Sequence, residues 1–598
     1  MKKIYLSGIL SVLLFSCTDI LDITSPDAIS GSVMWTTEEL ADKGVLGIYG
    51  VFYNTDLNDI AAGSAGGINK QGIESLGFCT AYAGSCGILT SETPSASDAY
   101  VTKEWKFGYE GIHRCNDAIA NLYKAPISES KYGRLMAECK FLRAFFYYRL
   151  NQLFQGVPVY LEPIENDECT RGQVSADSVW QVCINDLTDV IKEPNISDNT
   201  LNTLYGRPSK GAAYALRGMV YLWKKEYDLA LSDFENVEKC GYSLFQGSYL
   251  DQFSYANEKN SEMIFPLQYS DAMGYYDNIQ QMVGARDHHD SWTVLQPSCD
   301  FVNSFQNADG SPFDWADHFP GFNNLTGIQK EMYFLRDGLK SSTETAYKDF
   351  WNELDNRGAN SLVKRLYLDS GNEDRLRACY ENRDPRLKQI VITPYEPYDC
   401  YSIWANDAKV MKNKELRWPF LNRGADGGDM WPDKRNSFYY IYRKYNEMTN
   451  SIIDNRAKCH NDYPLIRLTD VVLRRAECLN ALGDIDGAIE QTNRIRTRAG
   501  MPPLTNGGDG PNAVIDADDM LARIQYESRI ELCLEGVNFF NEVRWGTWMS
   551  KKGTGFKNAW GEITNGNWKQ NDAKWPWGAP ATEVQKNPNL KKREGWAY

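Results

Sequence analysis

The chain has 598 residues, with 64 basic against 79 acidic side chains, so its formal net charge is −15. Hydrophobic residues make up 42% and charged residues 24%, which is typical of a globular protein and excludes wholesale disorder. The acidic balance and the lack of any basic run argue against a nucleic-acid partner, because that affinity comes mostly from clustered Lys and Arg. Beyond the N-terminus no apolar run approaches the roughly 20 residues that cross a bilayer, which excludes a polytopic membrane protein.

The first residues have the pattern of an export signal. A short positive start, Met1-Lys2-Lys3, precedes an apolar run from Ile4 to Phe15 that is too short to span a bilayer. The run ends in Leu14-Phe15-Ser16-Cys17, which resembles a bacterial lipoprotein box, in which the Cys is acylated and becomes the mature N-terminus. We therefore expect a signal peptide over 1–16 and a lipidated, polar tether over 17–30, with Cys17 holding the protein to a membrane. An ordinary signal peptide with an incidental Cys is the alternative.

The other cysteines do not form a recognisable framework. Thirteen of the 14 remain when Cys17 is set aside, and their odd number and scattered spacing predict no disulfide pattern. No CxxC pair is present, so a zinc or redox motif has no support. Cys79 and Cys86 are the one close pair that suggests a disulfide.

Helical periodicity begins near residue 135. Apolar side chains recur every three or four positions from Leu135 to Leu153, which predicts an amphipathic helix ended by Gly156 and Pro158. Pro208 is expected in the first turn of the next helix, where proline is favoured.

Helical hairpins are predicted at both ends of the chain. The stripes of the first hairpin match the tetratricopeptide pattern and comprise Ala213, Leu216, Val220 and Trp223, then Tyr227, Ala230, Phe234 and Val237. The same pattern recurs around the turn Gly483-Asp484, and a further helix covers about Asp516 to Leu534. The predicted fold class is therefore mainly α, with tetratricopeptide-like hairpins forming a scaffold over 31–241 and 463–598.

A large irregular, loop-rich insertion over 242–462 separates the two helical regions. It is rich in Gly, Asn, Asp and aromatic residues, with possible short strands at Met263 to Tyr269 and Gln389 to Thr393. Long ordered insertions of this type usually carry function, so we expect ligand binding here. The last section, Trp560 to Tyr598, has the composition of a coil.

A series of short motifs occurs in order from the lipid signal to the last residues. They include Trp35 to Leu40, Trp105 to Asn116, Phe141-Leu142-Arg143-Ala144, Gly156-Val157-Pro158-Val159, Gly206 to Ala213, Asp309-Gly310-Ser311-Pro312, Asp384-Pro385-Arg386, Ile466 to Val471, Asn493 to Gly500, Glu531 to Gly536, and Asn587-Pro588-Asn589-Leu590 with Gly595-Trp596. Together these motifs resemble the SusD/RagB family of outer-membrane nutrient-binding lipoproteins. One departure is that Asn538 and Asn541 stand where the family usually shows an Arg and an Asp.

The resemblance implies a function and a location. Relatives capture an oligosaccharide outside the cell and pass it to a TonB-dependent transporter, a SusC-like barrel, so we expect the same partners and a lipid-anchored place at the cell outer membrane. The resemblance also implies binding without turnover, and hence no catalytic residues. Most motif residues, such as Arg207, Arg474, Arg475, Glu477, Arg529, Glu531 and Glu535, are better interpreted as caps and inter-helix salt links.

Sugar recognition requires flat aromatic rings beside forked polar groups. Trp and Tyr offer rigid contact area to the apolar face of a pyranose, while Asp, Asn and Arg bind its hydroxyls. The loops with the richest concentration of both types predict the ligand-binding residues Tyr275, Tyr276, Asp277, Arg286, Asp290, Trp292, Trp315, Tyr82 and Tyr100. For each ring, partial burial in the core is the competing interpretation.

Other functions have weaker support in the sequence. His288-His289 lies between two aspartates, but adjacent residues on a strand face opposite sides and no metal motif accompanies them, so we expect no metal and no cofactor. A helical glycoside hydrolase would need two facing carboxylates, which sequence alone does not exclude. A tetratricopeptide scaffold that grips a protein or peptide is the third possibility.

Overall fold

A computed structural model describes residues 31–53, 70–82, 86–270, 272–401, 411–422, 427–432, 437–446, 456–565 and 567–598. The predicted signal peptide, Cys17 and the tether all lie outside these ranges. None of the helices described is both long and apolar enough to cross a membrane.

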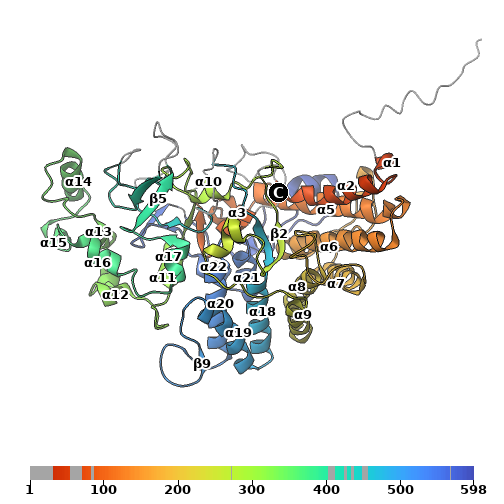
Figure 1. The fold of residues 1–598 in the computed structure, drawn as a ribbon. Helices are drawn as coiled ribbons and strands as arrows, with labels where there is room; N and C mark the ends of the chain where they lie inside the picture. The colour runs from red at the N-terminus through yellow and green to blue at the C-terminus, as the bar shows by residue number, and fades with distance from the viewer. Residues whose placement is uncertain are drawn as a thin grey trace, which may run out of the picture.

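The helical scaffold is a series of antiparallel neighbours, as the sequence predicts. Its members are α5 (Ala99–Asn121), α6 (Glu129–Phe154), α7 (Ala176–Lys192), α8 (Lys210–Trp223), α9 (Tyr227–Lys239), α18 (Leu468–Ala481), α19 (Ile485–Arg498) and α20 (Ala517–Glu531). Each packs against the next along this series, and α9 packs directly on α18 although more than 200 residues separate them. The chain therefore leaves the scaffold after α9 and returns to it at α18, on the two sides of the insertion (Figure 1). The predicted fold class is confirmed.

Local capping explains where these helices begin. The hydroxyls of Ser128 and Ser209 accept hydrogen bonds from backbone N–H groups in the first turns of α6 and α8, at 3.2 and 3.0 Å. Pro208 consequently lies just before the cap of α8 and not within its first turn. Gly483, with a φ of +87°, makes the left-handed turn between α18 and α19 that only glycine adopts without strain.

The insertion contains more helix than its composition suggests. Between α9 and α18 the described residues hold the short helices α10 (Ile279–Val283), α11 (Cys299–Ser304), α12 (Trp315–His318), α13 (Gly327–Phe334), α14 (Thr345–Asn356), α15 (Ser361–Lys364), α16 (Asn372–Ala378) and α17 (Arg386–Ile390). Helices α12 to α16 form the green lobe at the left of Figure 1. The predicted strand at Met263 to Tyr269 is β2 (Met263–Leu267), whereas Gln389 to Thr393 is the end of α17 followed by the short β4 (Val391–Ile392).

Short two-stranded ladders join segments within the insertion and connect the insertion to β1 and β8 outside it. Their strands are β1 (Thr80–Tyr82), β2, β3 (Leu295–Pro297), β4, β5 (Pro397–Tyr401), β6 (Met411–Glu415), β7 (Ile441–Tyr442) and β8 (Tyr463–Arg467). The antiparallel pairs are β1 with β3, β2 with β8, β4 with β7 and β5 with β6. Because β8 leads directly into α18, its pairing with β2 joins the insertion to the scaffold.

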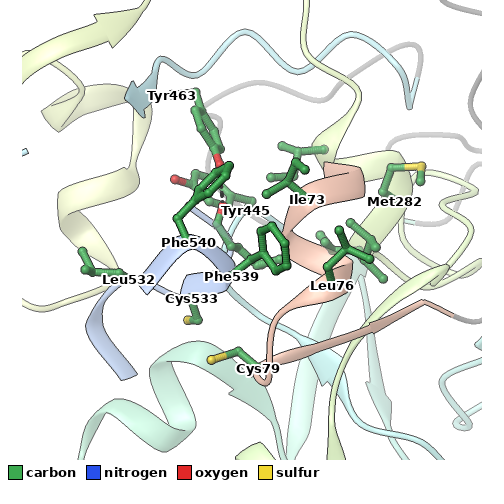
Figure 2. Packing of buried hydrophobic residues seen from close by; sticks show 14 of the residues in the cluster. Ile73, Leu76, Cys79, Met282, Tyr445, Tyr463, Leu532, Cys533, Phe539 and Phe540 are labelled. Carbon is green, nitrogen blue, oxygen red and sulfur yellow. Dashed lines mark hydrogen bonds between the residues drawn. The ribbon is translucent and has the colours of Figure 1, made fainter. Parts of the chain in front are cut away.

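The remaining elements flank these two parts. They are α1 (Gly31–Met34), α2 (Glu38–Tyr49), α3 (Lys70–Leu76), α4 (Gly87–Thr90), α21 (Asn538–Trp545), α22 (Trp548–Lys552), α23 (Ala581–Lys586), and the strands β9 (Thr505–Asn506), β10 (Ala513–Val514), β11 (Phe556–Lys557) and β12 (Ile563–Asn565). The described part of the predicted C-terminal coil thus contains the short strand β12 and the short helix α23. Figure 2 shows the core where α3, α10 and α21 meet, with Ile73, Leu76, Met282 and Phe539 around Tyr445.

A buried ion network lies where the insertion meets the scaffold. The fully buried guanidinium of Arg386 pairs with Asp384, Glu527 and Glu531 at 2.7–3.0 Å. Arg467 similarly bonds Glu535 at 2.6 Å. The predicted structural role of Glu531 and Glu535 is therefore confirmed, since each lies in this network and neither faces solvent.

The predicted disulfide between Cys79 and Cys86 is wrong. Both thiols are free and buried. Burial raises the pKa of the Cys86 thiol to about 11, so it behaves as a small apolar side chain.

Candidate functional site

Two predicted binding segments lie on either side of the short helix α10. Tyr275 and Tyr276 precede the helix, and Asp277 accepts a 2.9 Å hydrogen bond from the backbone N–H of Ile279 at its start. Trp292 follows the helix, and its backbone N–H donates to the carbonyl of Gln281 at 2.7 Å. The turn of chain around α10 therefore brings together residues that are 17 positions apart in sequence.

We define the aromatic platform as the rings of Tyr275, Tyr276, Trp292 and Trp431, whose chain segments are joined by backbone hydrogen bonds around α10. Tyr275 is 48% exposed and Trp431 is 38% exposed, while Tyr276 and Trp292 are half-buried. Tyr275 rests on Tyr53, with ring centroids 4.9 Å apart. Large rings are usually covered in a folded protein, so a group with this much exposure is typical of a binding surface.

Cations and one carboxylate surround Trp292. Asp290 pairs with Arg286 at 2.6 Å and also with Arg456, whose guanidinium lies 4.9 Å from the Trp292 ring centre. Burial and the neighbouring Arg286 lower the pKa of Arg456 from its usual value. Lys458, two residues further on, lies 4.9 Å from the ring centre of Tyr276. The same short segment therefore places a cation against each of two platform rings.

The backbone of Trp431 makes two hydrogen bonds to the residues that follow α10. Its carbonyl accepts a 2.9 Å bond from the backbone N–H of Arg286, and its N–H donates to the carboxylate of Asp287 at 2.5 Å. Asp287 also pairs with the buried Lys414 at 3.2 Å. Burial raises the pKa of Asp287, and Lys414 opposes that shift. The carboxylate thus anchors the ring and is not presented to a ligand.

The turn that carries Asp290 and Trp292 has unusual backbone geometry. His289, Asp290 and Thr293 have φ values of 54°, 53° and 46°, in the left-handed region that non-glycine residues rarely adopt. Each such residue costs on the order of 1–3 kcal/mol and persists only where the surroundings enforce it. Strain of this kind is concentrated at functional sites, which is a second reason to place the site here.

The adjacent histidines do not form a metal site. His288 is buried, and its Nε2 lies 2.6 Å from the carbonyl of Asn446. Burial, and then the neighbouring His289, lower the pKa of His288 to about 3, so its ring is neutral. Within the described ranges no group of three or more His, Cys, Asp or Glu side chains could hold a metal ion.

Trp315 lies away from solvent. It is only 6% exposed and stacks on Phe319 and Phe322, with ring centres 6.1 and 5.3 Å apart, while its Nε1 donates to Asn303 at 3.1 Å. The ring is therefore part of a buried aromatic cluster, and the prediction that Trp315 contacts a ligand has no support. The sequence Phe313-Asp314-Trp315 has the composition of a binding loop. Its burial is not evident from these three residues, because the rings that cover Trp315 come from residues further along the chain.

Tyr82 and Tyr100 form a separate pair near Cys86. Both rings are half-buried, and burial raises the pKa of each phenol. The pairing of β1 with β3 sets Tyr82 opposite Leu295, three residues from Trp292. This ladder links the pair to the platform through the backbone, and their contact with a ligand stays a prediction.

Three residues of the site were not predicted from the sequence. Trp431, Arg456 and Lys458 all belong to the insertion, and Trp431 follows a Gly-rich stretch of the type that signalled the other loops. Arg456 and Lys458 carry no local signal. Their position depends on the backbone bridge between Asp277 and Cys459, which joins segments 182 residues apart.

The fold and the site define a class of protein, in which a helical-repeat scaffold carries a long insertion that exposes aromatic rings. The chain belongs to the SusD family, whose profile matches residues 254–596. A second profile, described as starch-binding and associating with the outer membrane, matches residues 74–222. The sequence is 22% identical to SusD-like protein P25 of Formosa agariphila over 89% of this chain and 87% of that protein.

Solved structures share the same fold. A SusD-like carbohydrate-binding protein from Bacteroides fragilis matches with a TM-score of 0.71 and 19% identity, over 94% of this chain and 100% of the other. Surface glycan-binding protein A from Bacteroides thetaiotaomicron, solved in complex with laminarihexaose, matches with a TM-score of 0.58 and 16% identity, over 93% of this chain and 100% of the other.

Proposed function

We propose that this protein is a surface glycan-binding lipoprotein that captures an oligosaccharide on the aromatic platform. The observation that carries the proposal is Trp292, a half-buried ring flanked by Arg456 and by the ion pair of Asp290 with Arg286. An indole face suits the C–H face of a pyranose, and the partly exposed guanidinium groups of Arg286 and Arg456 suit its hydroxyls. Asp290 is buried and holds these two arginines in place. Among the matched structures are a carbohydrate-binding protein and a complex with laminarihexaose, which supports the same ligand class.

The platform is better suited to binding than to hydrolysis. A glycoside hydrolase needs two carboxyl groups facing the scissile bond, one of them protonated. Of the carboxylates beside Trp292, Asp290 is neutralised by two arginines and Asp287 is occupied by Lys414 and the Trp431 backbone. We infer binding without turnover.

The proposal extends to location and delivery. Lipidation of Cys17 would hold the protein at the outer membrane, and a SusC-like TonB-dependent transporter would receive the ligand, as membership of the SusD family suggests. Incorporation of labelled fatty acid that disappears in Cys17→Ala tests the anchor. Co-purification of a TonB-dependent barrel with the tagged protein tests the partner.

Affinity electrophoresis through gels containing laminarin, starch or other glycans tests the function, and laminarin and starch come first because similar proteins are described as binding them. Retarded migration without release of shorter sugars is the expected result. Release of products would indicate an enzyme. Free migration in every glycan would contradict the proposal and favour a protein-binding scaffold.

A further inference from the structure

A cavity lies on the helical scaffold and shares no lining residue with the platform. It has a volume of about 620 Å³, within the range of small-molecule sites. One wall is a face of α5, the second is the segment after α6 from Pro158 to Cys169, and the third is the C-terminal segment from Pro580 to Leu590.

Hydrogen bonds fix the three walls to one another. The hydroxyl of Tyr109 on α5 donates to the carbonyl of Pro158 at 2.7 Å, which joins the first two walls. The side-chain amide of Asn587 donates to the carbonyl of Arg171 at 2.9 Å, which joins the C-terminal segment to the segment after α6. Asn116 adds a 3.0 Å bond from α5 to the carbonyl of Tyr160. The cavity is therefore preformed, and a ligand need not order it on binding.

Aromatic rings line the inner part of the cavity. Trp105, Tyr109 and His113 occur at intervals of four residues, so they lie along one face of α5. Trp105 and Tyr109 are 4.9 Å apart between ring centres, and Tyr160 approaches Tyr109 at 6.2 Å. His113 is exposed at the rim of the cavity.

Charges of both signs line the cavity, and Lys106 adds one further cation to the pairs that follow. The acidic residues of its lining each lie beside a cation: Glu110 with Arg114 at 2.7 Å, Glu162 with Arg171 at 2.9 Å, and Glu583 with Lys586 at 3.1 Å. A site for a phosphate or for an organic cation would instead concentrate one sign of charge. The lining therefore suits an uncharged ligand that has apolar faces and polar edges.

We propose that this cavity is a second carbohydrate-binding site, which takes a neutral saccharide segment. The inference rests on the proposed function for the ligand class but not for the place of binding. Because the cavity and the platform use different residues, binding at one does not block the other, and for a glycan long enough to span them the second contact would be intramolecular. The protein would then retain polysaccharides more strongly than oligosaccharides that reach only one site.

The first test fills the cavity from its rim. His113→Trp adds bulk at an exposed position of α5, and Asn185→Trp, at an exposed position of α7 away from the cavity, is the matched control. We expect His113→Trp to weaken retention of a long glycan at least tenfold and to leave retention of a short platform ligand unchanged. Equal behaviour of the two variants on the long glycan would overturn the proposal.

The second test places the ligand by protection of a thiol. Among the cysteines that the structure describes, twelve are buried and Cys169, which lines the cavity, is exposed. Mass-spectrometric mapping of the alkylated peptide should show that a saturating glycan slows modification of Cys169, both in the natural protein and in Trp292→Ala. An unchanged rate while Trp292→Ala loses retention would overturn the second site and leave the platform intact. Protection of Cys169 together with unchanged glycan retention in Trp292→Ala would support the cavity and contradict the platform. Protection by peptides but not by glycans would overturn the saccharide assignment.

Discussion

Two aromatic groups in the same insertion have opposite environments. The rings around Trp315 stack on one another and are closed to solvent, whereas Trp292 and its neighbours lie at the surface. Arginine and lysine side chains lie beside the rings of both groups. Both groups occur beside aspartates in similar loops, so composition does not distinguish them. Their difference teaches that cations beside a ring do not decide its exposure, since a ring becomes core where other rings complete its packing and stays open where they do not.

Removing the buried ring of Trp315 is the strongest test of this difference between the two groups. We expect Trp315→Ala to lower the free energy of unfolding by about 3–5 kcal/mol, because it deletes a core side chain and leaves a cavity. Chemical denaturation measures the loss. Glycan retention, measured well below the melting temperature, should remain as in the natural protein. Lost retention with unchanged stability would show that Trp315 contacts the ligand after all.

A buried carboxyl beneath the platform gives the next largest effect. Asp462 accepts a 2.9 Å bond from the backbone N–H of Tyr269, and its pKa is raised to about 8, mainly by burial and then by Glu258. The folded protein therefore holds a proton that the unfolded chain releases near the ordinary value of about 3.9. Asp462 therefore contributes fully to the free energy of unfolding below the pKa of the unfolded chain, and this contribution is lost as the pH rises toward the folded pKa of about 8.

We expect Asp462→Asn to flatten this dependence, because an amide keeps the acceptor and cannot ionise. The gain over the natural protein should reach on the order of 2 kcal/mol near the alkaline end and be close to zero at acid pH. Denaturation curves across this pH range measure it. If the two proteins lose stability in parallel, Asp462 does not titrate in the folded state.

The scaffold was largely predictable, and the insertion was not. Periodicity and the Gly483 turn were sufficient to predict α18 and α19, because helices and their ends depend on nearby residues. The packing of α9 on α18 and the bridge between Asp277 and Cys459 join distant segments and leave no local signal. The same limit explains why the sequence predicts ligand contact for Tyr275, Trp292 and Trp315 alike, although Trp315 lies in the core and the other two rings reach the surface.

Removing the central ring of the platform should mainly affect binding. We expect Trp292→Ala to weaken glycan retention by about tenfold, or roughly 1.4 kcal/mol, since both the stacking face and its contact with Arg456 are lost. Isothermal titration with the retained glycan measures the change. Trp292→Phe keeps a smaller flat face and should recover part of the affinity. If Phe is no better than Ala, the indole acts through something other than stacking.

The smallest expected effect compares two tyrosines of similar exposure. Tyr275 on the platform and Tyr255 outside it are 48% and 43% exposed, and each contacts one neighbouring ring at 4.9 Å. Replacing either by Ala should change stability by no more than about 0.5 kcal/mol, as is usual for surface positions. Only Tyr275→Ala should weaken glycan binding, by about 1 kcal/mol or roughly fivefold. Exposure of a single ring is not sufficient to bind a sugar, and Tyr275 acts together with the other rings of the platform. Equal losses of affinity in both variants would mean that the binding surface extends well beyond the platform.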